Sequence, residues 1–334
     1  MIKTLWTGLL CLMISATGFA QVRDTLPDQD LFSDTAIDYD ELLNDLDAFL
    51  DSILNPRSYF LANVSAGSGY FNYARGNSLK VDTKKSIALS PTIGYYHKSG
   101  PGLTLSGNMA DGQKGLTLYQ YVLTPSFDFN QNFNWVAGVS YSRYFNRDSL
   151  PFYISPLQNE VSAYFTWRKP WLQPGITASY GWGSREEFQK RERFIRILRL
   201  RRLIVTSDRS EEVSDFFVAA SVRHSFYWMR LGGEKNYLKF TPQLAFSAGS
   251  QKFGFNHTTS AFVNNNRRDF SMVYNNGDVS MDEKTKFQPL SMTLYLRPEY
   301  NMGRFFVQPQ FILDYYMPAE DLSALFSLNA GVIL

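Results

Sequence analysis

LRPEYNMGRFFVQPQF, residues 296–311, has the form of a β-hairpin, because two arms of alternating apolar and polar residues flank Asn301-Met302-Gly303. Each arm nevertheless contains a proline, Pro298 or Pro309. Proline cannot donate a ladder hydrogen bond and is confined to edge strands or bulges. The hairpin therefore requires a sheet that tolerates both prolines, and the rest of the sequence must show what that sheet is.

The same period of two recurs along most of the chain after Pro56. Residues 87–96, 238–249 and 290–300 each place apolar side chains on one face and small, polar or charged side chains on the other. Such runs cover roughly ten to thirteen residues, which exceeds the usual soluble strand of about five or six and is enough to cross a bilayer. Twelve runs begin near Tyr59, Lys85, Leu103, Leu116, Trp135, Glu160, Leu172, Val213, Tyr237, Gln288, Arg304 and Leu322.

The connections between these runs mostly alternate between short and long. The short ones are residues 98–102, 130–134, 168–171, 232–236 and 301–303, and the long ones include 146–159, 184–212 and 250–287. An even number of long strands with tight turns at one end predicts an all-β fold, an antiparallel up-and-down transmembrane β-barrel. Both termini are then expected at the short-turn end.

Three observations favour lipid outside this barrel over the alternative, a secreted soluble β-sandwich. The apolar face repeats over all twelve runs, and the opposite face is rich in Gly, Ser and Ala, as a narrow lumen requires. Tryptophans also lie beside the short turns, as an interfacial girdle requires. They are Trp135, Trp167, Trp171 and Trp228.

Over residues 57–334 the chain resembles Gram-negative outer-membrane β-barrel proteins, and it is porin-like in architecture. The resemblance implies a cell outer-membrane location, with outer-membrane lipid and lipopolysaccharide as neighbours. The closing segment 322–334 ends without an overhang, but it ends on Leu334 where the family favours phenylalanine. Five prolines of the apolar face, each near a short turn, are expected to form one ring at the periplasmic rim: Pro125, Pro174, Pro242, Pro298 and Pro309.

The N-terminal segment has three predicted parts. Residues 1–20 have the charge, apolar run and small-x-small ending of a cleaved signal peptide, and they contain Cys11, the only cysteine. Disulfides and thiol chemistry are therefore not expected in the mature chain. Residues 21–37 have no period and are expected to be a flexible acidic leader. Residues 38–55 have the apolar stripe and acidic first turn of an amphipathic periplasmic helix.

Charge divides the chain unevenly, which suggests that the N-terminal segment interacts with another surface. Ten acids against one base give residues 21–55 a net charge of −9, whereas 31 bases against 21 acids give residues 56–334 a net charge of +10. The acidic helix is therefore expected to dock on its own barrel or to bind another periplasmic protein. An isolated helix of this length is marginal in water and needs such a partner.

Catalytic signals are sparse, and no enzyme activity or cofactor is predicted. The zinc-protease, phosphate-loop and serine-hydrolase motifs are absent, and a mature chain with three histidines and no cysteine does not predict a transition-metal site. His97 and Ser99, two residues apart, resemble the pair of outer-membrane phospholipases, but no third group to orient the histidine is evident. A lipid-modifying enzyme is therefore the weakest of three functional hypotheses.

Residues 185–205, REEFQKRERFIRILRLRRLIV, are the most basic stretch of the chain. Arginine forks suit phosphates and carboxylates, so this loop is a candidate for contact with lipopolysaccharide or an anionic solute. The alternative is an extended, solvated hairpin whose arginines pair locally. Nucleic acid is not expected as a partner. The candidate anion-binding residues are Arg193, Arg196, Arg199, Arg201 and Arg202.

Strand parity points seven charged residues into the lumen, where they pair with one another or line a pathway. A barrel of twelve strands lies between side-chain-filled small barrels and open large ones. The first functional hypothesis is therefore a narrow, gated diffusion channel for small solutes, favouring anions. The alternative is a non-conducting envelope or surface-interaction barrel. The candidate lumen charges are Glu160, Arg168, Arg223, Lys239, Arg297, Glu299 and Asp314.

Overall fold

The computed structural model describes residues 58–74, 81–112, 115–129, 132, 134–148, 150–201, 213–233, 236–250, 253, 260–264, 269–273, 287–318 and 320–334. Residues 51–334 form one compact unit. The predicted signal peptide, leader and acidic helix 38–55 lie outside the described residues, so they stay predictions.

The described chain is almost entirely strands. The strands are β1 (Tyr59–Ala74), β2 (Val81–Tyr96), β3 (Pro101–Gly112), β4 (Gly115–Phe129), β5 (Trp135–Asn146), β6 (Asn159–Trp167), β7 (Gln173–Trp182), β8 (Ser214–Arg223), β9 (Phe226–Met229), β10 (Asn236–Ser250), β11 (Ser260–Asn264), β12 (Asp269–Val273), β13 (Gln288–Met302), β14 (Phe305–Tyr316) and β15 (Asp321–Ile333). The helix α3 (Arg185–Arg201) connects β7 to β8.

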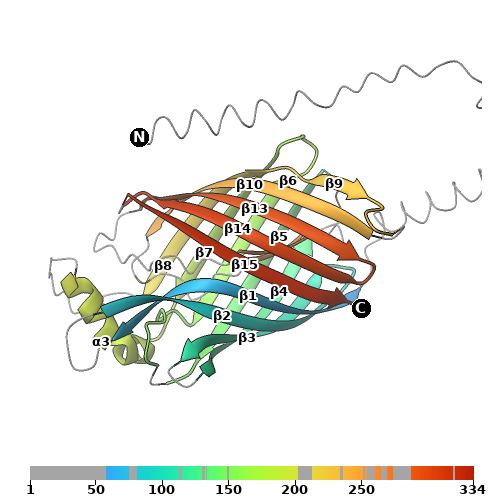
Figure 1. Cartoon of the computed structure of the whole chain (residues 1–334). Helices are drawn as coiled ribbons and strands as arrows, with labels where there is room; N and C mark the ends of the chain where they lie inside the picture. Colours follow the sequence, from blue (N-terminus) through green and yellow to red (C-terminus); the bar gives the residue numbers. More distant parts are fainter. Residues whose placement is uncertain are drawn as a thin grey trace, which may run out of the picture. The chain divides into compact units, whose positions relative to one another are not determined.

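All of these strands except β11 and β12 form a closed antiparallel barrel with twelve strand positions, as predicted (Figure 1). Neighbours in sequence pair around the barrel, β1 pairs with β15, and β10 pairs with β13 to complete the circle. β8 and β9 both pair with β10 and together occupy one of the twelve positions. At the short-turn end, the backbones of Phe60 and Leu334 exchange two hydrogen bonds of 2.8 and 2.9 Å, so the barrel's first and last strands close there.

The prolines of the opening hairpin interrupt the ladder, as a missing N–H requires. The β13–β14 ladder runs to Leu296 and Phe311 and resumes at Tyr300 and Val307, so Pro298 and Pro309 face each other in the gap. By facing each other, the two prolines share one interruption instead of causing two.

Pro242 explains why one barrel strand is divided into β8 and β9. The β8–β10 ladder ends at the pair Arg223 and Gln243, and the β9–β10 ladder begins at the pair Phe226 and Phe240. The gap between them contains His224 and Ser225 opposite Thr241 and Pro242. Proline has no N–H to donate there, whereas its carbonyl still accepts the His224 N–H at 3.3 Å. A similar gap surrounds Pro125 in the β4–β5 ladder.

The long-loop end differs from the prediction in three places. β1 and β2 are paired continuously from Tyr59 and Tyr96 to Ala74 and Val81, so β2 begins four residues earlier than expected. The added residues at the start of β2 do not alternate between apolar and polar, as a membrane-embedded strand would. Backbone hydrogen bonding alone extends the β1–β2 ladder there. A second hairpin, β11–β12, lies within the loop after β10.

The third difference is that residues 185–201 form the helix α3, so the alternative of an extended hairpin is wrong. Ser184 caps the helix by accepting the Glu187 N–H at 3.2 Å, which matches the Ser-x-x-Glu pattern of a capping box. Glu187–Arg191 and Glu192–Arg196 are i,i+4 ion pairs. These pairs and the cap were readable from the sequence. Within the described ranges, no helix is long and apolar enough to cross a membrane.

Candidate functional site in the barrel lumen

Most inward-facing side chains of the barrel wall are polar, and several of them are buried charged residues. Glu160, Lys239, Arg297, Glu299 and Asp314 are each at most 7% exposed. Arg168 and Arg223 are less completely covered, but the Nε atom of each is buried. All seven candidate lumen charges therefore lie on the inner side of the barrel wall or at its rim.

The acidic residues among the candidate lumen charges accept hydrogen bonds, some of them from neighbouring strands. Glu160 accepts from the Tyr144 hydroxyl at 2.8 Å and from the Ser162 hydroxyl at 2.8 Å. Glu299 accepts from the side-chain amides of Asn301 and Gln308 at 2.7 and 3.0 Å. These contacts join adjacent strands and hold the carboxylates against the wall.

The basic members converge near the short turns from elements far apart in sequence. We call Arg168, Arg223, Lys239 and Arg297 the cationic cluster. Arg168 follows β6, Arg223 ends β8, Lys239 lies in β10 and Arg297 lies in β13. Because β8 pairs with β10 and β10 pairs with β13, barrel closure places three of these residues on consecutive strands.

A loop fills the lumen at the opposite end. We call residues 147–158, between β5 and β6, the plug loop. Phe152 is 2% exposed and packs edge-on against Phe71 and Tyr119, with ring centroids 5.0 and 5.3 Å apart. The same apolar cluster includes inward residues of strands across the barrel: Ala245, Tyr295, Ile312 and Leu325. The plug loop is thus part of an apolar layer that crosses the lumen.

The plug loop is also paired with the barrel backbone. Phe152 forms an isolated antiparallel bridge with Tyr73 at the end of β1, and the Tyr153 N–H donates to the Asn72 carbonyl at 2.9 Å. Because backbone hydrogen bonds are directional, these contacts define the position of the loop in the lumen more narrowly than side-chain packing alone would.

The helix α3 packs against the plug loop. Phe194 and Ile195 of α3 form an apolar cluster with Tyr153, Leu157 and Phe253. The Tyr153 hydroxyl donates to the Phe253 carbonyl at 2.8 Å. The plug loop is therefore held between the barrel wall and α3.

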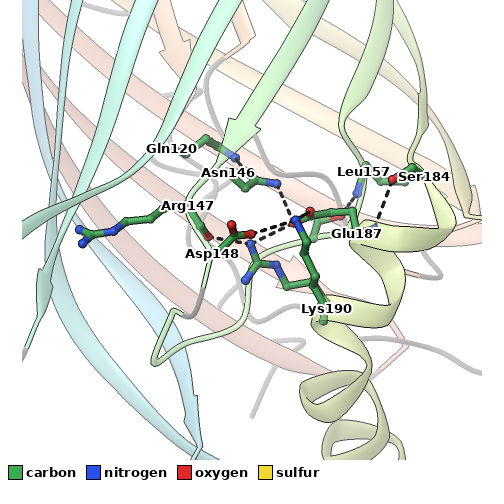
Figure 2. A network of polar contacts seen from close by, with 10 residues as sticks. Gln120, Asn146, Arg147, Asp148, Leu157, Ser184, Glu187 and Lys190 are labelled. Carbon is green, nitrogen blue, oxygen red and sulfur yellow. Dashed lines mark hydrogen bonds and ion pairs between the residues drawn. The ribbon is translucent and has the colours of Figure 1, made fainter.

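A polar network joins α3 to the plug loop and to the barrel (Figure 2). Glu187 pairs with Arg191 at 3.0 Å, and both side chains are at most 5% exposed. Arg191 in turn donates to the Arg147 carbonyl at 3.1 Å. Asn146 donates to Glu187 at 3.5 Å and accepts from Gln120 at 2.7 Å, which extends the network into the barrel wall.

A second ion pair joins the plug loop to α3 in a more exposed position. The Lys190 ammonium lies 2.9 Å from the Asp148 carboxylate. The hydrogen bond from Lys190 lowers the pKa of Asp148, and the hydrogen bond to Asp148 raises the pKa of Lys190. Both groups are charged at neutral pH, which lies between the two pKa values. The stabilisation by this pair is lost as pH falls through the lowered pKa of Asp148, and also as pH rises through the raised pKa of Lys190.

Most of the basic candidates of residues 185–205 lie on the helix α3. Arg193 and Arg196 are exposed on α3, and Arg196 pairs with Glu192 at 2.6 Å. Arg199 and Arg201 belong to the last turn of α3. Arg202 lies outside the described residues.

The His97–Ser99 pair is exposed in the short turn between β2 and β3. The His97 Nδ1 atom lies 2.7 Å from the Ser99 hydroxyl and also accepts the Ser99 N–H at 3.3 Å. In the part of the chain that is described, no carboxylate forms an ion pair with His97. No group of three or more His, Cys, Asp or Glu side chains within that part could hold a metal ion.

Comparison with known proteins gives likeness in structure alone. No family model and no curated protein sequence matches the chain. Among solved structures, the NanC porin is 8% identical, with a TM-score of 0.38 over 81% of this chain and 98% of that one. An outer membrane channel from Pseudomonas putida F1 is 10% identical, with a TM-score of 0.41 over 84% and 96%. The translocator domain of the autotransporter NalP from Neisseria meningitidis is 12% identical, with a TM-score of 0.38 over 88% and 94%.

Proposed function

We propose that this protein is an outer-membrane β-barrel whose lumen is a narrow, gated channel for small solutes. The observation that carries the proposal is the contrast between the inner wall and the plug loop. Most of the inner wall is lined by polar and charged side chains, whereas the plug loop adds Phe152 and Ile154 to an apolar layer at one level of the lumen. If the barrel interior served only to stabilise the fold, it would need no polar lining. Apolar side chains can fill a small barrel without the cost of removing charged groups from water.

The outer face supports a membrane location. Large apolar side chains are exposed there on successive strands, including Ile93 at 60% and Leu105 at 44%. Exposed apolar area of this extent on a soluble protein would favour aggregation. Three of the four tryptophans predicted for the girdle are also exposed beside short turns: Trp167, Trp171 and Trp228.

Channel activity can be tested directly by recording currents from the purified full-length protein in planar bilayers. Because the apolar layer blocks the lumen, we expect a quiet baseline with rare, small steps. Protein that inserts into vesicles but never conducts, even after the plug loop has been replaced, would contradict the proposal.

Membrane exposure of the outer face can be tested at Leu105, in the central part of β3. We expect Leu105→Arg to destabilise the barrel in lipid vesicles by about 2–4 kcal/mol, because the charge would face hydrocarbon. The measurement is denaturant unfolding in vesicles. Leu105→Ala is the matched control, since it shortens the side chain without adding charge. Equal stability of the arginine and alanine variants would indicate that this face meets water.

A second candidate is a non-conducting surface-interaction barrel, favoured by the exposed bases of α3. Arg193 and Arg196 extend from the end of the barrel that carries the long loops, where lipopolysaccharide phosphates would lie if the topology is that of an outer-membrane protein. Silence in bilayers together with lipopolysaccharide binding that depends on these arginines would favour this candidate.

We further propose that the acidic segment, residues 21–55, interacts with the basic barrel or with another periplasmic protein. The charge difference supports an intramolecular contact, because the segment carries −9 and residues 56–334 carry +10. The cationic cluster also lies near the short turns, at the end where β1 begins.

A further inference from the structure

The cationic cluster is arranged around one polar side chain. Gln243 of β10 lies opposite Arg223 of β8 in the strand register, and it accepts a hydrogen bond from the Arg297 guanidinium of β13. Arg223 and Arg297 therefore both neighbour Gln243, on the two strands that flank β10. Arg168 approaches the same region from the turn after β6, beside β7, whose residue Gln173 pairs with Arg223.

Several donors of this cluster lack acceptors. Buried N–H groups without a hydrogen-bond partner are found on Arg168 (Nε and Nη2), Arg223 (Nε) and Arg297 (Nε), and Arg297 as a whole is only 3% exposed. Leaving a buried donor unsatisfied costs about 1–3 kcal/mol, and more for charged groups.

The cluster also lacks enough negative charge. Throughout the described ranges, no carboxylate lies within 4 Å of the guanidinium nitrogens of Arg168, Arg223 or Arg297. Lys239 faces Glu299 across the β10–β13 ladder, and Asp128 accepts a hydrogen bond from the Tyr164 hydroxyl, so neither acid forms an ion pair with an arginine of the cluster. Buried charges are normally paired, because removing an ion from water is costly. Three arginines without a direct ion-pair partner therefore favour a bound anion.

A small cavity lies beside these groups. Its volume is about 20 Å³, and its polar lining includes Arg223, Gln243, Tyr164, Gln173 and Thr166. A volume of this size accommodates roughly one water-sized group. The cavity can therefore receive one oxygen of an anion, but it is too small to enclose a whole solute.

We propose that the cationic cluster binds the oxyanion group of a small solute, a carboxylate or a phosphate. Guanidinium forks match these groups because two N–H donors meet two oxygens. The inference rests on the proposed channel and names the class of solute that it would favour. Binding is measured without any current, so failure of this site and failure of channel activity can be told apart.

The test is thermal unfolding of the purified full-length protein in detergent, with phosphate or acetate titrated at constant ionic strength against chloride. We expect a saturable rise in melting temperature for at least one of the two anions. In Arg223→Gln and Arg297→Gln, the apparent affinity for that anion should fall by about ten- to a hundredfold, because each variant loses a charge-assisted contact. Arg223→Lys, which keeps the charge but not the fork, should bind with intermediate affinity.

The matched control is Arg304→Gln, which removes an exposed arginine at the turn between β13 and β14. Phosphate stabilises many proteins without binding to a site, so the comparison between variants decides. An unchanged affinity in Arg304→Gln together with a loss in both lumen variants supports the site. An equal response to phosphate and acetate in wild type, Arg223→Gln and Arg297→Gln would overturn it.

A carboxylate could also come from the acidic segment of the same chain. Neutralising the ten acids of residues 21–55 distinguishes the two sources. A stronger response to added phosphate or acetate in that variant means that the segment's carboxylates occupied the same site, whereas an equal response means that the site takes free solutes. Anion binding without current, even after the plug loop has been replaced, would support the site and contradict the channel. Current without anion binding would support the channel and contradict the site.

Discussion

Replacing residues 150–157 with a glycine-serine stretch of equal length is expected to raise single-channel conductance on the order of tenfold, because a twelve-stranded barrel has room for more than wall side chains. The replaced residues include Phe152 and Ile154, which are 2% and 6% exposed and belong to the apolar layer. Their removal takes the central side chains out of the apolar layer, while the twelve strands keep their ladders. Currents from the variant and the wild type in the same bilayer provide the measurement.

The structure also offers a reversible version of this experiment. Phe152 and Tyr73 form an isolated antiparallel bridge, and the hydrogen bond from Tyr153 to Asn72 identifies them as a non-hydrogen-bonded pair. Cα atoms of such pairs are about 4.5 Å apart, which a disulfide can span. Cys11, in the predicted signal peptide, is the only native cysteine. Tyr73→Cys combined with Phe152→Cys should therefore lock the plug loop to β1 when oxidised.

The same double variant is its own control. We expect low conductance after oxidation and higher conductance after reduction, because only the reduced loop can leave the lumen. If oxidised and reduced protein conduct equally, plug-loop movement does not gate the barrel. If the glycine-serine variant conducts no better than wild type, the loop is not the barrier.

Glu187→Gln is expected to weaken the attachment of α3 to the plug loop by about 3–5 kcal/mol, because it leaves Arg191 buried without its counter-charge. The two side chains are at most 5% exposed and 3.0 Å apart. Opening and unfolding of α3 should make the backbone after Arg193 and Arg196 accessible to trypsin. When opening is fast relative to cleavage, this loss corresponds to cleavage about a hundredfold faster or more.

The helix supplies a matched control for this substitution. Glu192 and Arg196 have the same i,i+4 spacing, but their side chains are 44% and 67% exposed. An exposed pair contributes about 0–1 kcal/mol, so Glu192→Gln should change cleavage little. Equal cleavage rates in the two variants would mean that burial of the Glu187–Arg191 pair does not secure α3.

The sequence was sufficient to predict the strands because each strand has one face toward the apolar exterior and one toward the lumen. That environment imposes a period of two, and the twelve predicted runs match the twelve barrel strands. The prolines were also informative, since each lacks an N–H wherever it is placed. Pro298 and Pro309 do interrupt the ladder.

The sequence was less informative about residues 185–201, where tertiary packing hides the helical pattern. Ser184 and Glu187 form a readable cap, but the buried side chains of α3 are interrupted by Arg191, which is buried only because Glu187 and the Arg147 carbonyl receive it. No hydropathy pattern assigns an arginine to a buried face. The plug loop was equally hidden, because its apolar residues have no regular period.

By itself, the sequence determined the strand number, the two faces of each strand and the inward parity of the charged residues, since all of these follow from local alternation. Only the tertiary structure decided which inward residues meet. Arg168, Arg223 and Arg297 lie on separate strands or turns and are brought together by barrel closure. Phe152 reaches the lumen because the long connection after β5 folds back into it. Contacts between residues so distant in sequence depend on strand pairing and loop path, which no local pattern encodes.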